Sequence, residues 1–260
     1  MDWSDWGLTL SRGVVGERVD YARLIADRSS LDRFLARVAR VGPESTPRFF
    51  PDRDSRLAYA INCYNATILR SVLALERDGK LPRHVPGDLE SRYQFQIDGH
   101  LQTPAMLRQC ALAVAGEDWR VRFVLCDGRA NGPSLFRHVI LGEMLDAQLD
   151  EVVRAAFRSL DVVRIDHGER KRLLLWRGLY DLRDRLVGDF EQRMQTRDAT
   201  ILGVLLAWSD RPRRELLNSA VGYEVALMSS SDEVNALEPT PETDEGVFSK
   251  LKSLRFIRPQ

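Results

Sequence analysis

The sequence lacks the cysteine pattern of a disulfide-stapled or zinc-binding protein. Its three cysteines, Cys63, Cys110 and Cys126, are an odd number, and none forms a CxxC pair. This argues against a disulfide framework or a cysteine-based zinc site, and it favours reduced thiols in a cytoplasmic protein. We expect no metal and no other cofactor, because the four histidines are not spaced as a metal pair: His84, His100, His138 and His167.

Net charge and long apolar runs are also missing. The chain has 38 basic and 38 acidic residues, whereas proteins that bind nucleic acid usually carry a basic excess. No apolar run approaches the roughly 20 residues that span a bilayer, and the acidic, tryptophan-rich N-terminus does not resemble a signal peptide. We therefore expect a cytoplasmic protein with neither a nucleic-acid nor a membrane partner. The 260 residues are enough for one sizeable core.

Helical periodicity dominates the chain. Apolar spacing predicts one long or two short helices over 19–41, single helices over 55–77, 104–115 and 141–160, and two or three helices over 179–219. Strands are predicted at 93–97 before an Asp98-Gly99 turn, at 121–126, at 162–165 and 172–176 as a hairpin, and at 223–228. The pattern predicts an α+β class, with a helix-rich single domain over 1–228 and a small, mostly antiparallel sheet.

The last part of the chain differs in composition. Residues 229–246 carry six acids, no base and two prolines, which predicts a disordered acidic linker. Residues 247–260 form a basic-apolar tail. This tail could pack on the domain, dock on a partner or fray, and the sequence leaves these alternatives open.

Cys126 is the strongest candidate for chemistry, because the common templates (P-loop, GxGxxG, GxSxG and HExxH) are missing. It ends the expected buried strand and begins a loop rich in Gly, Asn and Pro. A thiolate here could attack an acyl carbon while the amides of Asp127, Gly128 and Arg129 stabilise the oxyanion. The alternative is a small buried apolar residue, which is also the role that helical patterns favour for Cys63 and Cys110.

Asn62, Tyr64 and Asn65 form a second group of polar residues on the apolar helix expected over 55–77. Buried amides are costly unless they are hydrogen-bonded. The favoured interpretation is that these side chains tie buried loops in place. The functional alternative is that Asn62 or Asn65 reaches into a site.

Several segments together resemble one known family. The stretch 57–67, LAYAINCYNAT, resembles the "LAFWINxYNA" helix of the domain-of-unknown-function family 547. The stretch 19–24 matches its "VDYxxL", 97–100 its glycine hairpin, 123–133 its "FALxCG…P" loop, and 145–151 with the following hairpin also fits. The resemblance covers roughly residues 14–190. It implies a fold similar to papain-like and transglutaminase-like enzymes and a thiol site at the position of Cys126.

The sequence departs from this family at the expected base. The family's Glu-His pair on the preceding helix falls on Arg108 and Gln109 here. A thiol of ordinary pKa needs a base or a positive neighbour, and arginine cannot shuttle protons. His100 or His138 is therefore the candidate replacement for the missing imidazole.

These observations support three hypotheses. The first is a cysteine-dependent acyl-transfer or amide/thioester-processing enzyme acting on a small-molecule or peptide acyl substrate, with catalytic residues Cys126, His100 or His138, and Asn62. The second is a catalytically silent binding or regulatory protein with a protein partner. The third is a recast pocket in which Arg108 holds a carboxylate or phosphate. We rank the enzyme first because the sequence retains the cysteine and the loop of the family pattern at Cys126. The expected substrate-binding residues are Tyr64, Asn65, Arg108, Gln109, Gly128 and Arg129.

Overall fold

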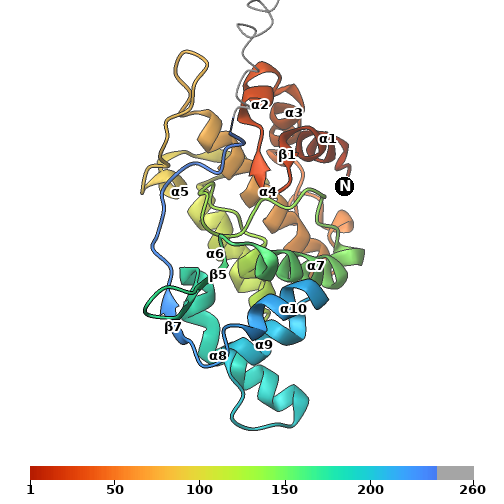
Figure 1. Ribbon diagram of the computed structural model, residues 1–260. Helices are drawn as coiled ribbons and strands as arrows, with labels where there is room; N and C mark the ends of the chain where they lie inside the picture. The colour runs from red at the N-terminus through yellow and green to blue at the C-terminus, as the bar shows by residue number, and fades with distance from the viewer. Residues whose placement is uncertain (239–260) are drawn as a thin grey trace, which may run out of the picture.

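A long buried helix, α4 (Arg53–Leu73), lies at the centre of the molecule in the computed structural model, which describes residues 1–238 (Figure 1). Asp52 and Ser55 form a capping box at its N-terminus. Every residue from Leu57 to Leu69 is buried, so the helix is enclosed on all sides. The expected helix over 55–77 is confirmed, although it ends four residues early.

The N-terminal elements cover one end of α4. They are α1 (Ser4–Gly13), the two-residue strands β1 (Val14–Val15) and β2 (Arg18–Val19), α2 (Tyr21–Ala26), α3 (Ser29–Val38) and the short 3-10 helix η1 (Pro47–Phe49). Asp20 caps α2 by accepting a hydrogen bond from the Arg23 amide. The region 19–41 thus contains two short helices, one of the two alternatives that its periodicity allowed.

The next elements pack against α4 and α3. They are α5 (Leu89–Arg92), the antiparallel hairpin β3 (Phe95–Ile97) and β4 (His100–Gln102), and α6 (Pro104–Ala115). Asp98 and Gly99 both have positive φ, as a two-residue hairpin turn requires. The Thr103 side chain caps α6 by accepting from the Met106 amide. The turn and this helix start are confirmed.

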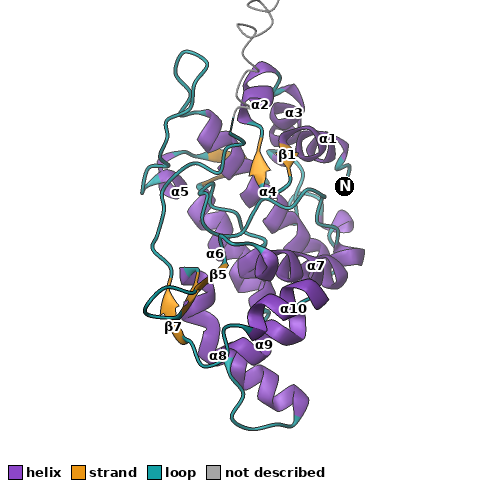
Figure 2. Cartoon of the chain, viewed as in Figure 1, coloured by secondary structure: helices purple, strands orange, loops and turns teal. Residues whose placement is uncertain are grey.

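The C-terminal half adds a second helical group and a small sheet (Figure 2). Helices η3 (Gly142–Met144), α7 (Leu145–Arg158), α8 (Arg177–Met194), α9 (Ile201–Trp208) and α10 (Arg211–Asn218) accompany β5 (Val163–Asp166), β6 (Arg172–Leu175) and β7 (Glu224–Leu227). Strand β5 pairs antiparallel with β6, and β7 pairs parallel with β6. The hairpin, the last strand and the three helices agree with the sequence prediction, and the fold is α+β and helix-rich.

The strand predicted over 121–126 is wrong. These residues lie in and after the 3-10 helix η2 (Trp119–Phe123), whose first turn is capped by Asp118. Within residues 1–238 no strand pairs with them in a ladder. Their backbone groups are satisfied locally and by the Asn65 side chain, so the apolar run reflects burial rather than a β-strand.

The disordered linker predicted over 229–246 is wrong for residues 229–238. Residues 232–237, which we call the strap, run in an extended conformation against the domain and form main-chain hydrogen bonds to it. Figure 1 shows this blue segment leaving β7 and passing α5 toward α2. The rest of the linker and the tail at 247–260 lie outside the described residues.

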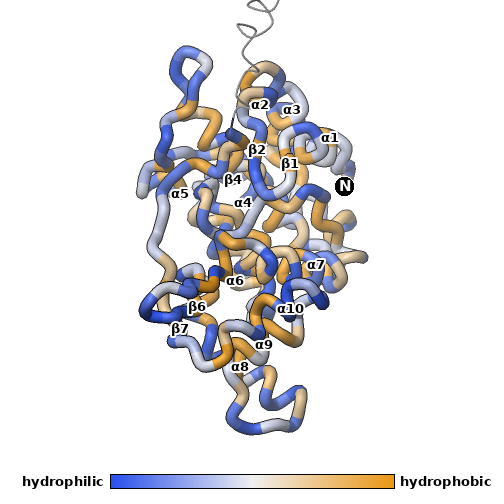
Figure 3. Tube along the Cα trace, in the orientation of Figure 1, coloured by the Kyte–Doolittle hydropathy of each residue, from blue (hydrophilic) through white to orange (hydrophobic). Residues whose placement is uncertain are grey.

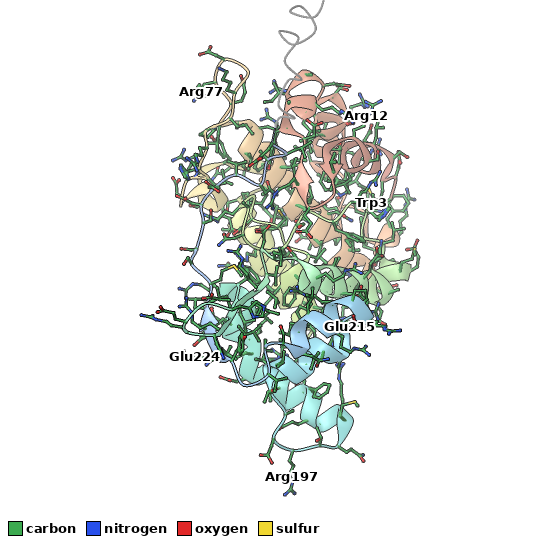
Figure 4. The ribbon with its side chains drawn as sticks, viewed as in Figure 1. Trp3, Arg12, Arg77, Arg197, Glu215 and Glu224 are labelled. Carbon is green, nitrogen blue, oxygen red and sulfur yellow. The ribbon has the colours of Figure 1, made fainter. Side chains whose placement is uncertain are left out.

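Buried apolar side chains from both helical groups form one core, and the outer loops are hydrophilic (Figure 3). Arg77 and Arg197 lie at opposite ends of the molecule and point into solvent (Figure 4). Within residues 1–238 no helix combines the length and apolar character that crossing a bilayer requires. The same residues contain no group of three or more His, Cys, Asp or Glu side chains placed to hold a metal ion.

Candidate functional site

Cys126 lies in the loop after η2 with its backbone held by α4. The Asn65 side chain accepts a hydrogen bond from the Cys126 amide at 3.1 Å and donates to the Val124 carbonyl at 2.9 Å. Asn65 thus replaces the strand partner that this segment lacks. These two bonds confirm the interpretation of Asn65 as a loop tie, and its role in binding substrate stays a prediction.

The strap covers Cys126. Strap residues form six main-chain hydrogen bonds of 2.6–3.0 Å to three separate segments: the loop before α5, the loop after Cys126 and strand β2. The bonds join Asp232 to Val85, Glu233 to Ala130, Val234 to Arg83, Asn235 to Gly128, and both Asn235 and Leu237 to Val19. The strap therefore behaves as an added strand between irregular segments that do not pair with each other.

Asn235 places its side chain directly on the thiol. Its amide nitrogen donates to Cys126 Sγ at 3.6 Å, and its amide oxygen accepts from the Tyr21 hydroxyl at 2.8 Å. Asn235 and Cys126 are only 2% and 3% exposed. Burial raises the pKa of the Cys126 thiol to about 12, and the Asp127 carboxylate adds to this rise. At neutral pH the sulfur is a protonated thiol beneath a carboxamide.

The two histidines expected as replacement bases are engaged elsewhere on the surface. His100 Nε2 lies 3.1 Å from Glu44 Oε2, and His138 stacks edge-on against Phe136. Both imidazoles are exposed. Within the described residues, which include all four histidines, no hydrogen bond joins an imidazole to Cys126. The expected Cys-His arrangement is therefore not assembled in this structure.

Asn62 ties another loop to α4. Its amide nitrogen donates to the Ile140 carbonyl at 2.7 Å, and its oxygen accepts from the Ile140 amide at 3.1 Å and from Trp6 Nε1 at 3.0 Å. The side chain is 1% exposed, and these bonds use one of its two N–H donors and both lone pairs of its oxygen. They assign Asn62 the role of tying the loop before η3, and its catalytic role stays a prediction.

Tyr64 and Arg108 meet at one carboxylate. The Tyr64 hydroxyl donates to Glu90 Oε1 at 2.6 Å, and Arg108 donates to the same oxygen at 3.1 Å. The guanidinium that the third hypothesis assigns to a ligand anion thus already binds Glu90 from α5. Gln109, the neighbour of Arg108, is exposed on α6. The contact of Glu90 with Tyr64 and Arg108 could not be predicted from the sequence, because α5 is a single turn of helix and is too short to show a periodic pattern.

A polar cleft with a volume of about 460 Å³ lies beside this region. Cys126 does not line it. Arg129 and Asp127 both line it, and the Arg129 guanidinium pairs with the Asp127 carboxylate at 3.0 Å. The other lining residues come from the loop after Cys126, the start of α8 and the chain leading into the strap: Asn131, Trp176, Arg177, Met228, Ser230, Ser231 and Asp232.

Gly128 is required for the geometry of the loop after Cys126. Its φ is +81°, and a Cβ atom added there would lie 2.9 Å from a methyl group of Val72. Gly128 supports the strap through its carbonyl, which accepts from the Asn235 amide. Its carbonyl therefore serves the strap, while its amide, the group expected in an oxyanion nest, hydrogen-bonds the Cys126 thiol and partly offsets the rise in the pKa of that thiol.

Comparison with family models, curated proteins and solved structures finds no match for this chain.

Proposed function

We propose that this protein is a catalytically silent binding or regulatory protein in which the thiol region serves recognition. The observation that carries the proposal is the state of Cys126. Its sulfur is buried beneath the strap, contacts the Asn235 carboxamide and keeps its proton up to about pH 12.

The thiol-enzyme hypothesis requires more from the same residues. A nucleophilic cysteine needs its thiolate, an activating neighbour and an open path to the acyl carbon. Here the adjacent charge is the Asp127 carboxylate, which disfavours the thiolate, and the path is filled by Asn235. Asn62 and Asn65 are committed to loop backbone. The geometry supports the binding hypothesis better than acyl transfer.

The proposal is tested by acylating the full chain with p-nitrophenyl acetate at pH 7.5 and mapping the adducts by mass spectrometry. Cys110 is exposed, so the buried role that its helical pattern favoured is wrong. We expect slow acylation of Cys110 and no adduct on Cys126 in the folded protein. A Cys110→Ser variant provides the matched control, because it removes the accessible thiol and leaves Cys126 in place.

An acyl adduct that forms on Cys126 and turns over in the Cys110→Ser variant would contradict the proposal. Such a result would restore the enzyme hypothesis and require the strap to open during each cycle.

A further inference from the structure

The strap is bound in the manner of a peptide ligand. Of its six residues only Asn235 is buried, while Asp232 and Leu237 are exposed and the other three are half-buried. Its attachment therefore comes from main-chain hydrogen bonds and a few polar side chains rather than from apolar burial. This is how extended peptides bind when they add a strand to a protein edge, where main-chain bonds provide affinity and side-chain pockets provide specificity.

The groove beneath the strap recognises two chemical features of the segment that it binds. A carboxamide fits between the Tyr21 hydroxyl, which donates, and the Cys126 sulfur, which accepts. A carboxylate at the same place would give up the amide donor, could accept only from the weak S–H donor of the thiol, and would lie near the Asp127 charge. The central position is therefore selective for asparagine.

The second feature is acidic and precedes the asparagine. The Arg83 guanidinium donates to Glu233 at 2.7 Å, and His84 hydrogen-bonds Asp232 at 2.9 Å. Both contacts lie at the surface, so they contribute to choice of ligand more than to stability. With these two features, the groove favours an extended segment that contains two acidic residues, one spacer residue and an asparagine, in that order.

We propose that this groove is a peptide-binding site and that the strap is its resident ligand, which an extended partner peptide of the type acid-acid-spacer-asparagine replaces. The inference rests on the proposed binding function and names the ligand class. The strap follows three serines, Ser229 to Ser231, and the polar cleft lies beside them. A longer incoming peptide extends into this cleft, toward Arg129 and Arg177.

The test uses the full chain and a fluorescein-labelled peptide with the sequence of residues 230–238, SSDEVNALE. In wild type the strap competes at the high effective concentration of a tethered segment. A Glu233→Lys/Asn235→Ala variant weakens the strap and leaves Tyr21, Arg83 and Cys126 intact. We expect this variant to bind the peptide at least about tenfold more tightly than wild type does, by fluorescence polarisation.

Two controls test specificity. Peptides in which asparagine is replaced by alanine or by aspartate should bind at least about tenfold more weakly. Adding Tyr21→Phe to the double variant should reduce the preference for asparagine over alanine, because the hydroxyl donor is removed. In parallel, iodoacetamide should label Cys126 faster in the double variant than in wild type, and the asparagine peptide should slow this labelling again.

The inference is overturned if the folded double variant does not bind the peptide, or if it binds the asparagine and alanine peptides equally. Formation of dimers without peptide binding, measured by light scattering, would also overturn it by making a second copy the ligand. If circular dichroism shows the double variant unfolded, Glu233→Lys alone carries the test with a smaller expected gain in peptide affinity, because that ion pair is exposed. Turnover at Cys126 would instead refute the proposed function, whichever way the peptide behaves.

Discussion

In this fold, side-chain amides form hydrogen bonds to the backbone of loops, as neighbouring strands do in a sheet. Asn62, Asn65 and Gln148 each bond to a loop main chain as donor and as acceptor, and Asn235 clamps the thiol. Asn62, Asn65 and Gln148 thereby satisfy loop backbone groups that have no ladder partner. The sequence predicted that polar residues on α4 tie loops in place, but only the structure shows which loops they hold.

Asn65→Ala should destabilise the protein by about 3 kcal/mol, because it leaves the buried Val124 carbonyl and Cys126 amide without partners. The measurement is urea unfolding of the variant and wild type. Gln109→Ala removes an exposed amide and serves as the control, with an expected change within about 0.5 kcal/mol. Equal stability of the two variants would refute the loop-tie assignment.

The raised pKa of Cys126 predicts a loss of stability in alkaline solution. The folded thiol keeps its proton up to about pH 12, whereas an unfolded cysteine releases it near pH 8.5. The folded state thus holds a proton that the unfolded state loses, so the contribution is complete below about pH 8.5 and falls as the pH rises toward 12.

Cys126→Ser removes this titration. Between pH 9 and 11 the free energy of unfolding of wild type should fall more steeply than that of the variant, by up to about 1.4 kcal/mol per pH unit. Parallel curves for the two proteins, measured by urea unfolding at each pH, would show that the folded thiol titrates normally.

Among the helices, strands and turns, features set by adjacent residues were predicted correctly, whereas features set by contacts between distant residues were not. The Asp98-Gly99 turn and the Thr103 cap depend on the types of adjacent residues, and both were predicted. The apolar run at 121–126 was misassigned because burial alone does not distinguish a strand from a packed loop. The strap was missed because its partners lie about 100 to 200 residues earlier in the chain, and its acids alone indicated disorder.

The loop after Cys126 depends on glycine at position 128. Gly128→Ala should destabilise the protein by about 2 kcal/mol, because alanine disfavours a φ of +81° and its methyl group would press on Val72. Gly188→Ala, in the middle of α8 with free space around it, should instead stabilise by about 0.5–1 kcal/mol. Thermal or urea unfolding measures both, and the opposite order would contradict the close packing of this loop.

At the scale of the molecule, the strap links segments that are far apart in sequence, yet little apolar surface holds it. Hydrogen exchange should therefore show the amides of Val234, Asn235 and Leu237 opening at a lower free energy than those of α4, whose residues are buried on all sides. Equal protection of the strap and α4 would mean that the strap separates only on global unfolding and would argue against exchange with a ligand.

The candidate site as a whole could be predicted only in part. Sequence placed Cys126 at its centre and Gly128 and Arg129 around it, because turn residues after an apolar run mark a position where function concentrates. It could not show that Asn235 and Tyr21 enclose the thiol, because neither residue has a local pattern that marks it. It also assigned His100 and His138 by proximity in sequence, which does not determine contact.

The most direct test of the account is the relative iodoacetamide labelling rate of the three cysteines in the native full chain at neutral pH. A thiol covered by the strap predicts that the exposed Cys110 reacts first and that Cys126 reacts at least about a hundredfold more slowly, together with the buried Cys63. If Cys126 reacted fastest, the sulfur would be an accessible, activated nucleophile, and the binding function proposed for this protein would be wrong.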